Sequence, residues 1–274
     1  MNLSQVHYDD EPNRALGSAT ALSTIIHPFN PHCPSMHMHI SWTEMKSGKG
    51  YWRLMADLNP SLNNPQDKQR FDACLREVSR ELYEYGSEQG DRYFYIPALG
   101  RHRGVSHFYL EEFNLQGEGK DIAFARAFGE AVIDCYCELL QQRFRAFASA
   151  DDYASQLAYH TLYFLQVLTL DRGTTAGLMV HEQNDLGILG SIPSHVDREL
   201  LGEWVERLPS PQDKLLRSLI ACLPKCSPAP VSDATKLQLA KVIRKHYHNY
   251  PEGLEMQARG NIIADTLGNH DLKR

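Results

Sequence analysis

The feature that most constrains the fold is a pair of extended segments joined by a short turn. Polar and apolar residues alternate over residues 36–41. In a strand, His37, His39 and Ser41 should therefore point to one face while the residues between them point to the other. Residues 50–57 form a second extended segment, and the Lys- and Gly-rich stretch between the two predicts an antiparallel hairpin. The pattern therefore predicts a sheet with three polar side chains on one surface.

Strand and helix patterns alternate along the rest of the chain. Further strands are predicted over residues 19–27, 92–98, 104–114 and 162–170, the last from an almost continuous apolar run. Helices are predicted over residues 65–86 and 121–148, from residue 152, within 200–223 and over 233–247. These elements predict an α+β fold, with one domain over residues 1–224 and a helical C-terminal extension over residues 225–274.

Composition and charge exclude several classes of protein. The chain has 42% hydrophobic and 23% charged residues, which is ordinary for a globular protein, and its net charge of −6 is spread along the sequence. No basic field would attract nucleic acid or anionic lipid. We expect no membrane span and a cytoplasmic location, because no apolar stretch is long enough and the start lacks a signal-peptide pattern. The six cysteines include no CxxC pair, which predicts reduced thiols.

Three ordered segments within residues 19–200 carry specific motifs. Ser-Thr-Ile-Ile-His-Pro-Phe-Asn-Pro occupies residues 23–31, and His37 follows His27 by ten positions. The other two are Tyr-Phe-Tyr-Ile with a later Arg-Gly and Phe-Tyr-Leu-Glu-Glu-Phe-Asn (residues 93–114), and Asp-Arg-Gly-Thr (residues 171–174). Together they resemble the oxygen-dependent coproporphyrinogen III oxidase family, whose first motif is Ser-x-x-x-His-Pro-x-Asn-Pro followed by a histidine.

The resemblance implies a fold, a reaction and catalytic residues. It implies a large antiparallel sheet flanked by helices on both faces, a homodimer, and oxidative decarboxylation of propionates to vinyl groups with O2 and no required organic cofactor. His37 would act as general acid or base, since an imidazole changes protonation near neutral pH. Glu111 and Glu112 match a stretch that usually carries paired aspartates, and strand alternation sends one of them inward. The alternative for His37 is a structural histidine hydrogen-bonded beneath a loop, and the alternative for either acid is a solvated strand residue.

The sequence departs from the family where substrate carboxylates would be held. The family follows its histidine with Asn-x-Arg, but this chain has His39 and Ser41 at those offsets. A family Gly-Gly-Arg segment is matched by residues 181–183, His-Glu-Gln. Serine and glutamine cannot reproduce the bidentate, charge-assisted contacts of arginine, so a tetracarboxylate porphyrinogen should bind poorly. We therefore expect a smaller substrate.

The remaining candidates for substrate contact come from the matched motifs and their altered positions. The full set is Ser23, His39, Ser41, Arg103, Arg172, His181 and Gln183. Arg103 and Arg172 are retained positive charges that could orient a carboxylate or a reduced oxygen species. Arg172 could equally stabilise a turn with Asp171, and Ser23 could equally satisfy loop backbone.

A metal site is a second possibility. His37, His39, His107 and His181 might converge, with Glu111 or Glu182 nearby, and imidazole with carboxylate suits iron, copper or zinc. No tight ligand motif such as HExxH is present, and thirteen histidines make chance groupings easy.

The leading hypothesis is an oxygen-dependent oxidase that decarboxylates or desaturates a small carboxylate, amino-acid-derived or aromatic. The alternatives are a true coproporphyrinogen III oxidase, a histidine-ligated metal-dependent oxidase, and a non-catalytic binding protein on the same scaffold.

Overall fold

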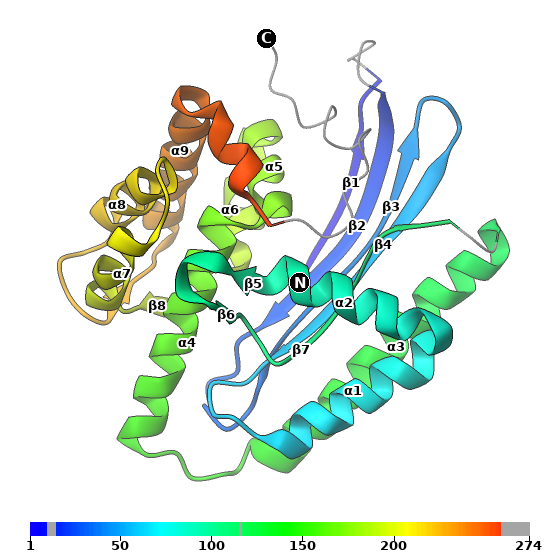
Figure 1. Ribbon diagram of the computed structural model, residues 1–274, viewed down its shortest axis with the longest axis horizontal. Coiled ribbons are helices and arrows are strands. Elements are labelled where there is room, and N and C mark those ends of the chain that lie inside the picture. The colour runs from blue at the N-terminus through cyan, green and yellow to red at the C-terminus, as the bar shows by residue number, and fades with distance from the viewer. Residues whose placement is uncertain (10–14, 115–116, 259–274) are drawn as a thin grey trace. The chain divides into compact units, whose positions relative to one another are not determined.

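The computed structural model describes residues 1–9, 15–114 and 117–258. These residues form two compact units (Figure 1). The first unit contains residues 1–93 and 104–147, less the gaps just given, and the second contains residues 94–103 and 148–258.

The first unit is built on a five-stranded sheet in which every neighbouring pair is antiparallel. In spatial order the strands are β1 (Asn2–His7), β2 (Leu16–Ile26), β3 (Ser35–Met45), β4 (Gly50–Asn59) and β7 (Ser106–Phe113). The antiparallel β3–β4 hairpin is confirmed, as are the strands predicted over residues 19–27 and 104–114. Strand β1 was not predicted, because four of its six residues are polar and give only a weak apolar signal.

Three helices belong to this unit: α1 (Pro65–Ser79), α2 (Tyr83–Phe94) and α3 (Glu118–Arg143). Helix α1 begins after Asn64, whose side chain accepts a hydrogen bond from the backbone N–H of Gln66. Helices α1 and α3 lie side by side (Figure 1) and pack on one surface of the sheet, here called the core face. The sheet residues of the core face are Met36, Met38, Leu54, Ala56, Leu58, Phe108, Leu110 and Phe113.

The strand predicted over residues 92–98 was wrong. Helix α2 continues to Phe94, and only the two-residue strand β5 (Tyr95–Ile96) is extended, pairing with β6 (Arg101–His102). The run of aromatic residues has high strand propensity, but Tyr93 packs its ring against that of Tyr109, with centroids 4.9 Å apart. Tertiary packing of the helix outweighed the local preference.

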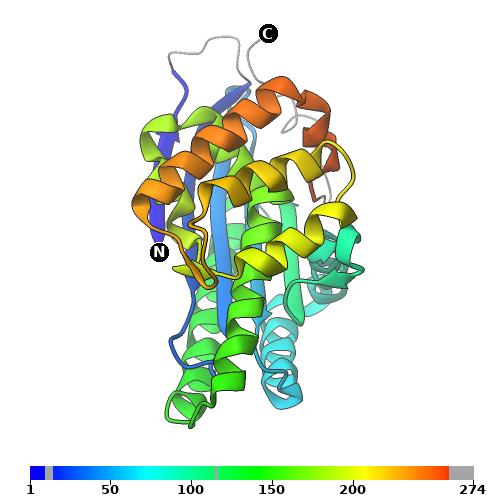
Figure 2. The ribbon, with the colours of Figure 1, turned by 90° about the vertical axis from the view of Figure 1, so that its left-hand side faces the viewer.

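The second unit consists mainly of helices. They are α4 (Ala150–Thr169), α5 (Arg172–Val180), α6 (Asp185–Ile188), α7 (Arg198–Trp204), α8 (Gln212–Cys222) and α9 (Asp233–Asn249), with a small hairpin of β8 (His195–Val196) and β9 (Ala229–Pro230). Short 3-10 turns lie at Arg80–Leu82, Pro97–Leu99, Glu182–Asn184, Leu189–Ser191, Val205–Arg207 and Pro251–Met256. Figure 2 shows α8 and α9 running next to each other.

The buried strand predicted over residues 162–170 was also wrong. These residues form the second half of α4, which begins at a capping box between Ser149 and Asp152. Every position from Thr161 to Thr169 is buried, so the segment shows no helical stripe. A short, uniformly apolar run cannot be assigned to strand or helix by periodicity alone.

Helix α9 packs against α5, α6 and α8 within the second unit. Arg244 on α9 holds Asp185 with two hydrogen bonds of 2.7 Å.

The domain boundary at residue 225 stays a prediction. All six cysteines are free thiols, as the sequence predicted. Within the part of the chain that the structure describes, no helix is both long and apolar enough to cross a membrane.

Candidate active site

The surface of the sheet opposite the core face carries polar side chains in rows across β3, β4 and β7, and is called the polar face. The register places His37 beside Asp57 and His107 in the first row, and His39 beside Met55 and Tyr109 in the second. In the third row Ser41 lies opposite Arg53, followed by Glu111. The predicted sharing of one surface by His37, His39 and Ser41 is therefore confirmed.

His37 forms a close pair with a buried aspartate on the neighbouring strand. Its Nδ1 lies 2.9 Å from Oδ1 of Asp57, whose side chain is fully buried, whereas the side chain of His37 is 17% exposed. The amide of Asn59 donates a 2.6 Å hydrogen bond to the other oxygen of Asp57. A carboxylate that accepts a hydrogen bond from Nδ1–H fixes the tautomer and leaves Nε2 as the reactive nitrogen.

Asp57 was missed at the level of sequence, although a signal was present. In an antiparallel hairpin the turn fixes which residues face each other, and here His37 pairs with Asp57. Extending the predicted register from the turn would have placed a carboxylate beside the candidate histidine.

His39 is held neutral on the second row. Burial, with smaller contributions from Arg53 and His37, lowers the pKa of His39 to about 3. Its Nε2 lies 3.0 Å from the hydroxyl oxygen of Ser41, within hydrogen-bond distance. Ser23 is paired with His39 on β2, so it also lies on the polar face. The second row therefore adds hydrogen-bonding groups without adding charge.

The third row contains an ion pair beside a β-bulge. Between Leu110 and Phe113, strand β7 has Glu111 and Glu112 where β4 has only Arg53. Glu111 is buried, with Oε1 3.8 Å from Nη2 of Arg53, whereas Glu112 is exposed. The structure thus places one of the two predicted acids on the polar face. Arg53 was not among the predicted residues.

The pKa of Arg53 is raised above its ordinary value. Burial is the largest single contribution and lowers the pKa, but Tyr109, Glu111, Tyr51 and Tyr93 together outweigh it and favour the charged form. The polar face therefore holds a permanent positive charge.

The other predicted contacts belong to the second unit. Arg103 is buried with its guanidinium over the rings of Phe94 and Tyr163, at 4.5 and 4.9 Å. Arg172 is the first residue of α5, where Asp171 caps the helix by accepting from the N–H of Thr174 at 2.6 Å.

His181 is half-buried at the end of α5, and Gln183 is exposed. Neither lies on a strand of the five-stranded sheet.

The predicted convergence of four imidazoles is not found. No three His, Cys, Asp or Glu side chains are grouped so that they could share a metal ion, within the described ranges of the chain. His107 instead places its Nδ1 2.7 Å from Asp91, and His37 is paired with Asp57. His37 and His107 are therefore each paired with a different carboxylate.

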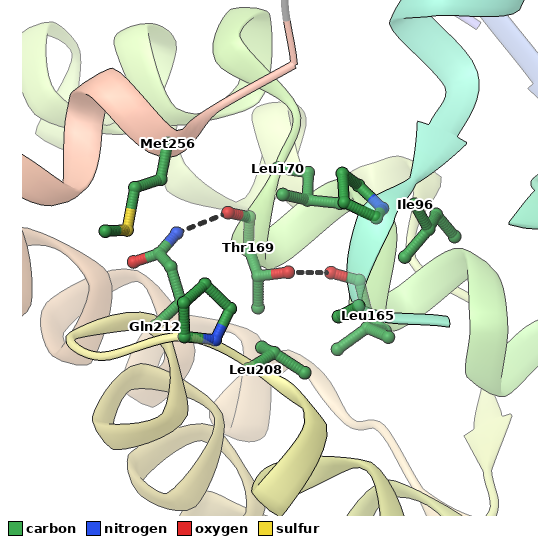
Figure 3. Close-up of a pocket in the computed structure, with 10 residues that line it drawn as sticks. Ile96, Leu165, Thr169, Leu170, Leu208, Gln212 and Met256 are labelled. Carbon is green, nitrogen blue, oxygen red and sulfur yellow. Dashed lines mark hydrogen bonds between the residues drawn. The ribbon is translucent and has the colours of Figure 1, made fainter. Parts of the chain in front are cut away.

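A small cavity in the second unit has different chemistry (Figure 3). It encloses about 60 Å³ between apolar side chains such as Leu165, Leu208 and Met256. Its polar side chain Gln212 donates to the carbonyl of Thr169 at 2.6 Å. The cavity lining contains no acidic or basic side chain, and the hydroxyl of Thr169 donates to the carbonyl of Leu165, so the polar face is the better candidate for an active site.

Comparison with known proteins agrees with this fold. The sequence model of the Coproporphyrinogen III oxidase family matches residues 2–220. The oxygen-dependent coproporphyrinogen-III oxidase of Rickettsia akari (strain Hartford) is 28% identical over 184 residues, covering 65% of this chain and 64% of that protein. The mitochondrial enzymes of Rattus norvegicus and Homo sapiens are 27% and 26% identical, each over 64% of this chain.

This chain belongs to the coproporphyrinogen III oxidase family. It spans only 42% of the length of the rat relative and 40% of the human one. Residues of α9 lie beyond the family match.

Proposed function

We propose that this chain is an oxygen-dependent oxidase that decarboxylates or desaturates a small carboxylate, aromatic or amino-acid-derived, at the His37–Asp57 pair. The observation that carries the proposal is this pair: an imidazole with a buried carboxylate on Nδ1, within the family-matched sheet. A histidine so oriented can exchange a proton with substrate through Nε2.

The decarboxylation balances without a further reductant or oxidant. R–CH2–CH2–COO⁻ with O2 and H⁺ gives R–CH=CH2, CO2 and H2O2. The bond to the carboxylate carbon and one C–H bond of the carbon next to R break, and a carbon–carbon double bond forms. Two electrons pass to O2, which becomes H2O2 with the proton from that C–H bond and the added H⁺. An electron-rich ring R supplies the electronic activation, so O2 serves as co-substrate and no organic cofactor is required. His37 would move the proton.

The size of the substrate follows from the polar face. At positions 39 and 41 the site has a neutral imidazole and a hydroxyl, which cannot bind several carboxylates. A compact substrate with few charges suits this surface better than a tetracarboxylate. Coproporphyrinogen oxidation by the same site is the second candidate, supported by the family match.

The test is oxygen uptake with a panel of aromatic and amino-acid-derived carboxylates labelled with ¹³C at the carboxyl carbon. We expect labelled CO2 and H2O2 in equal amounts from at least one member, or H2O2 alone if the reaction is desaturation. His37→Gln should lower the rate by about 10²- to 10⁴-fold. His248→Gln, at an exposed position near the end of α9, is the matched control and should retain full activity.

Coproporphyrinogen III is assayed alongside the panel. Efficient vinyl formation from it would contradict the small-substrate proposal and support the second candidate. No oxygen uptake with any compound would favour a binding protein. Because no group of three ligands is found among the described residues, we expect activity to survive dialysis against a chelator.

A further inference from the structure

Arg53 occupies an unusual position for an arginine. It lies on β4, the fourth strand of five, and faces the same side of the sheet as Asp57, four residues later. Its side chain is 22% exposed, so most of the charged group is removed from water. Burying a guanidinium is unfavourable unless its N–H groups are satisfied.

The guanidinium is incompletely satisfied by the protein. Its partner Glu111 is 3.8 Å from Nη2, beyond hydrogen-bond distance. Its Nε has no hydrogen-bond partner among the described residues. Because a guanidinium carries five N–H donors in a planar fork, Arg53 retains donors for a planar anion. Glu111 balances the charge without occupying the fork.

The position of Arg53 also sets a distance from the His37–Asp57 pair. Positions four apart on a strand are separated by about 13 Å. The row between them contains Met55 and His39, and His39 is uncharged because its pKa is lowered to about 3. An anion site and an acid–base site thus lie at opposite ends of an uncharged surface.

We propose that Arg53 is the carboxylate-binding residue of this site and that it selects a substrate with one aromatic ring and one short acid chain. The ring lies over the His39–Met55 row, with one end toward Arg53 and the other toward His37. Arg53 lies directly opposite Ser41, so the positive charge absent from β3 is supplied by β4. The reaction rests on the proposed function, whereas the binding role of Arg53 is tested separately from it.

The experiment measures binding by isothermal titration calorimetry, with indole-3-propionate, indole-3-acetate and 4-hydroxyphenylpropionate as probes. Each acid is compared with its primary amide, which has the same shape and no charge. The wild-type protein should bind at least one acid about 10- to 100-fold more tightly than its amide. Arg53→Gln should abolish this preference, and Arg53→Lys should retain part of it.

A relocation variant guards against a folding artefact. Ser41→Arg combined with Arg53→Ser moves the guanidinium to the opposite strand and should restore the preference that Arg53→Gln loses. Arg126→Gln, on the exposed surface of α3, is the matched control and should bind like the wild type. Circular dichroism and thermal unfolding confirm that each variant is folded.

The outcomes separate this inference from the proposed function. A wild-type protein that prefers no acid over its amide, or a folded Arg53→Gln variant that keeps the preference, overturns the role of Arg53. Loss of preference in Arg53→Gln without oxidation of any probe supports the role of Arg53 and removes support for the oxidase. Oxidation of a probe together with an unchanged preference for acid over amide in Arg53→Gln supports the oxidase and overturns the role of Arg53.

Discussion

The core face and the polar face are made by alternate residues of the same strands, but burial has different consequences on the two. On the core face, Leu54 and Phe108 are fully buried against α1 and α3, where close packing contributes to stability. On the polar face, burial removes Asp57, Arg53 and His39 from water, which is unfavourable for their polar groups. Groups kept in such surroundings at a cost in free energy are candidates for chemistry.

The largest expected effect on the turnover rate comes from breaking the His37–Asp57 pair. Asp57→Asn preserves the shape of the side chain but removes the charge that orients His37. We expect the turnover rate of the proposed reaction to fall by about 10²- to 10⁴-fold. ¹⁵N NMR should show a changed tautomer population for His37.

The control for that prediction is Asp91→Asn. Asp91 contacts Nδ1 of His107 at 2.7 Å in the same way, but its side chain is 57% exposed. The variant should alter His107 and leave the spectrum of His37 and the turnover rate unchanged. Equal losses in both variants would contradict a special role for Asp57.

A change on the core face should affect stability instead. Phe128→Ala on α3 removes a fully buried ring that lies 5.1 Å from that of Phe108. We expect the free energy of unfolding to fall by about 3–5 kcal/mol, from lost transfer free energy and the cavity left behind. Urea denaturation measures the change.

Phe147→Ala is the matched control, because this ring is 89% exposed. Its effect on the free energy of unfolding should stay within about 0.5 kcal/mol. If the two phenylalanines proved equivalent, the core face would not be the main source of stability in the first unit.

A smaller effect is expected on the binding of acids when the charge of Glu111 in the third row is removed. Glu111→Gln removes the negative charge beside Arg53 and leaves the guanidinium in place. We expect the acids of the binding panel to bind about 3- to 10-fold more tightly, since repulsion between two carboxylates is lost. Calorimetry with Glu112→Gln, which alters the exposed neighbour, should show little change.

The last prediction concerns the dependence of stability on pH. The pKa of His39 is about 3 in the folded protein, below the ordinary value of 6.5 that it has when unfolded. Between these values the unfolded state binds a proton that the folded state does not, so stability rises with pH up to about 6.5 and then levels off. His39→Gln should make this rise shallower in urea denaturation between pH 4 and 6.

His160 provides the comparison for the pH experiment. Burial lowers its pKa to about 4, so it contributes a similar dependence from the second unit. His160→Gln should remove only its own share of the slope. An unchanged slope in His39→Gln would contradict a neutral imidazole on the polar face.

Much of the site could be predicted from local pattern. Period-two alternation placed His37, His39 and Ser41 on one surface, and hairpin register would have added Asp57. The fold class was predicted from the mixture of strand and helix patterns, yet residues 162–170 were misassigned because burial on all sides hides helical periodicity.

The sequence by itself determined which side chains share a face, because alternation along a strand is a property of the backbone. Only the tertiary structure decided what those side chains do. The bulge that buries Glu111 but not Glu112 depends on how β4 and β7 pair, and the neutral state of His39 depends on exclusion of water. Pairing and desolvation act between segments that are distant in sequence, so local pattern carries no record of them.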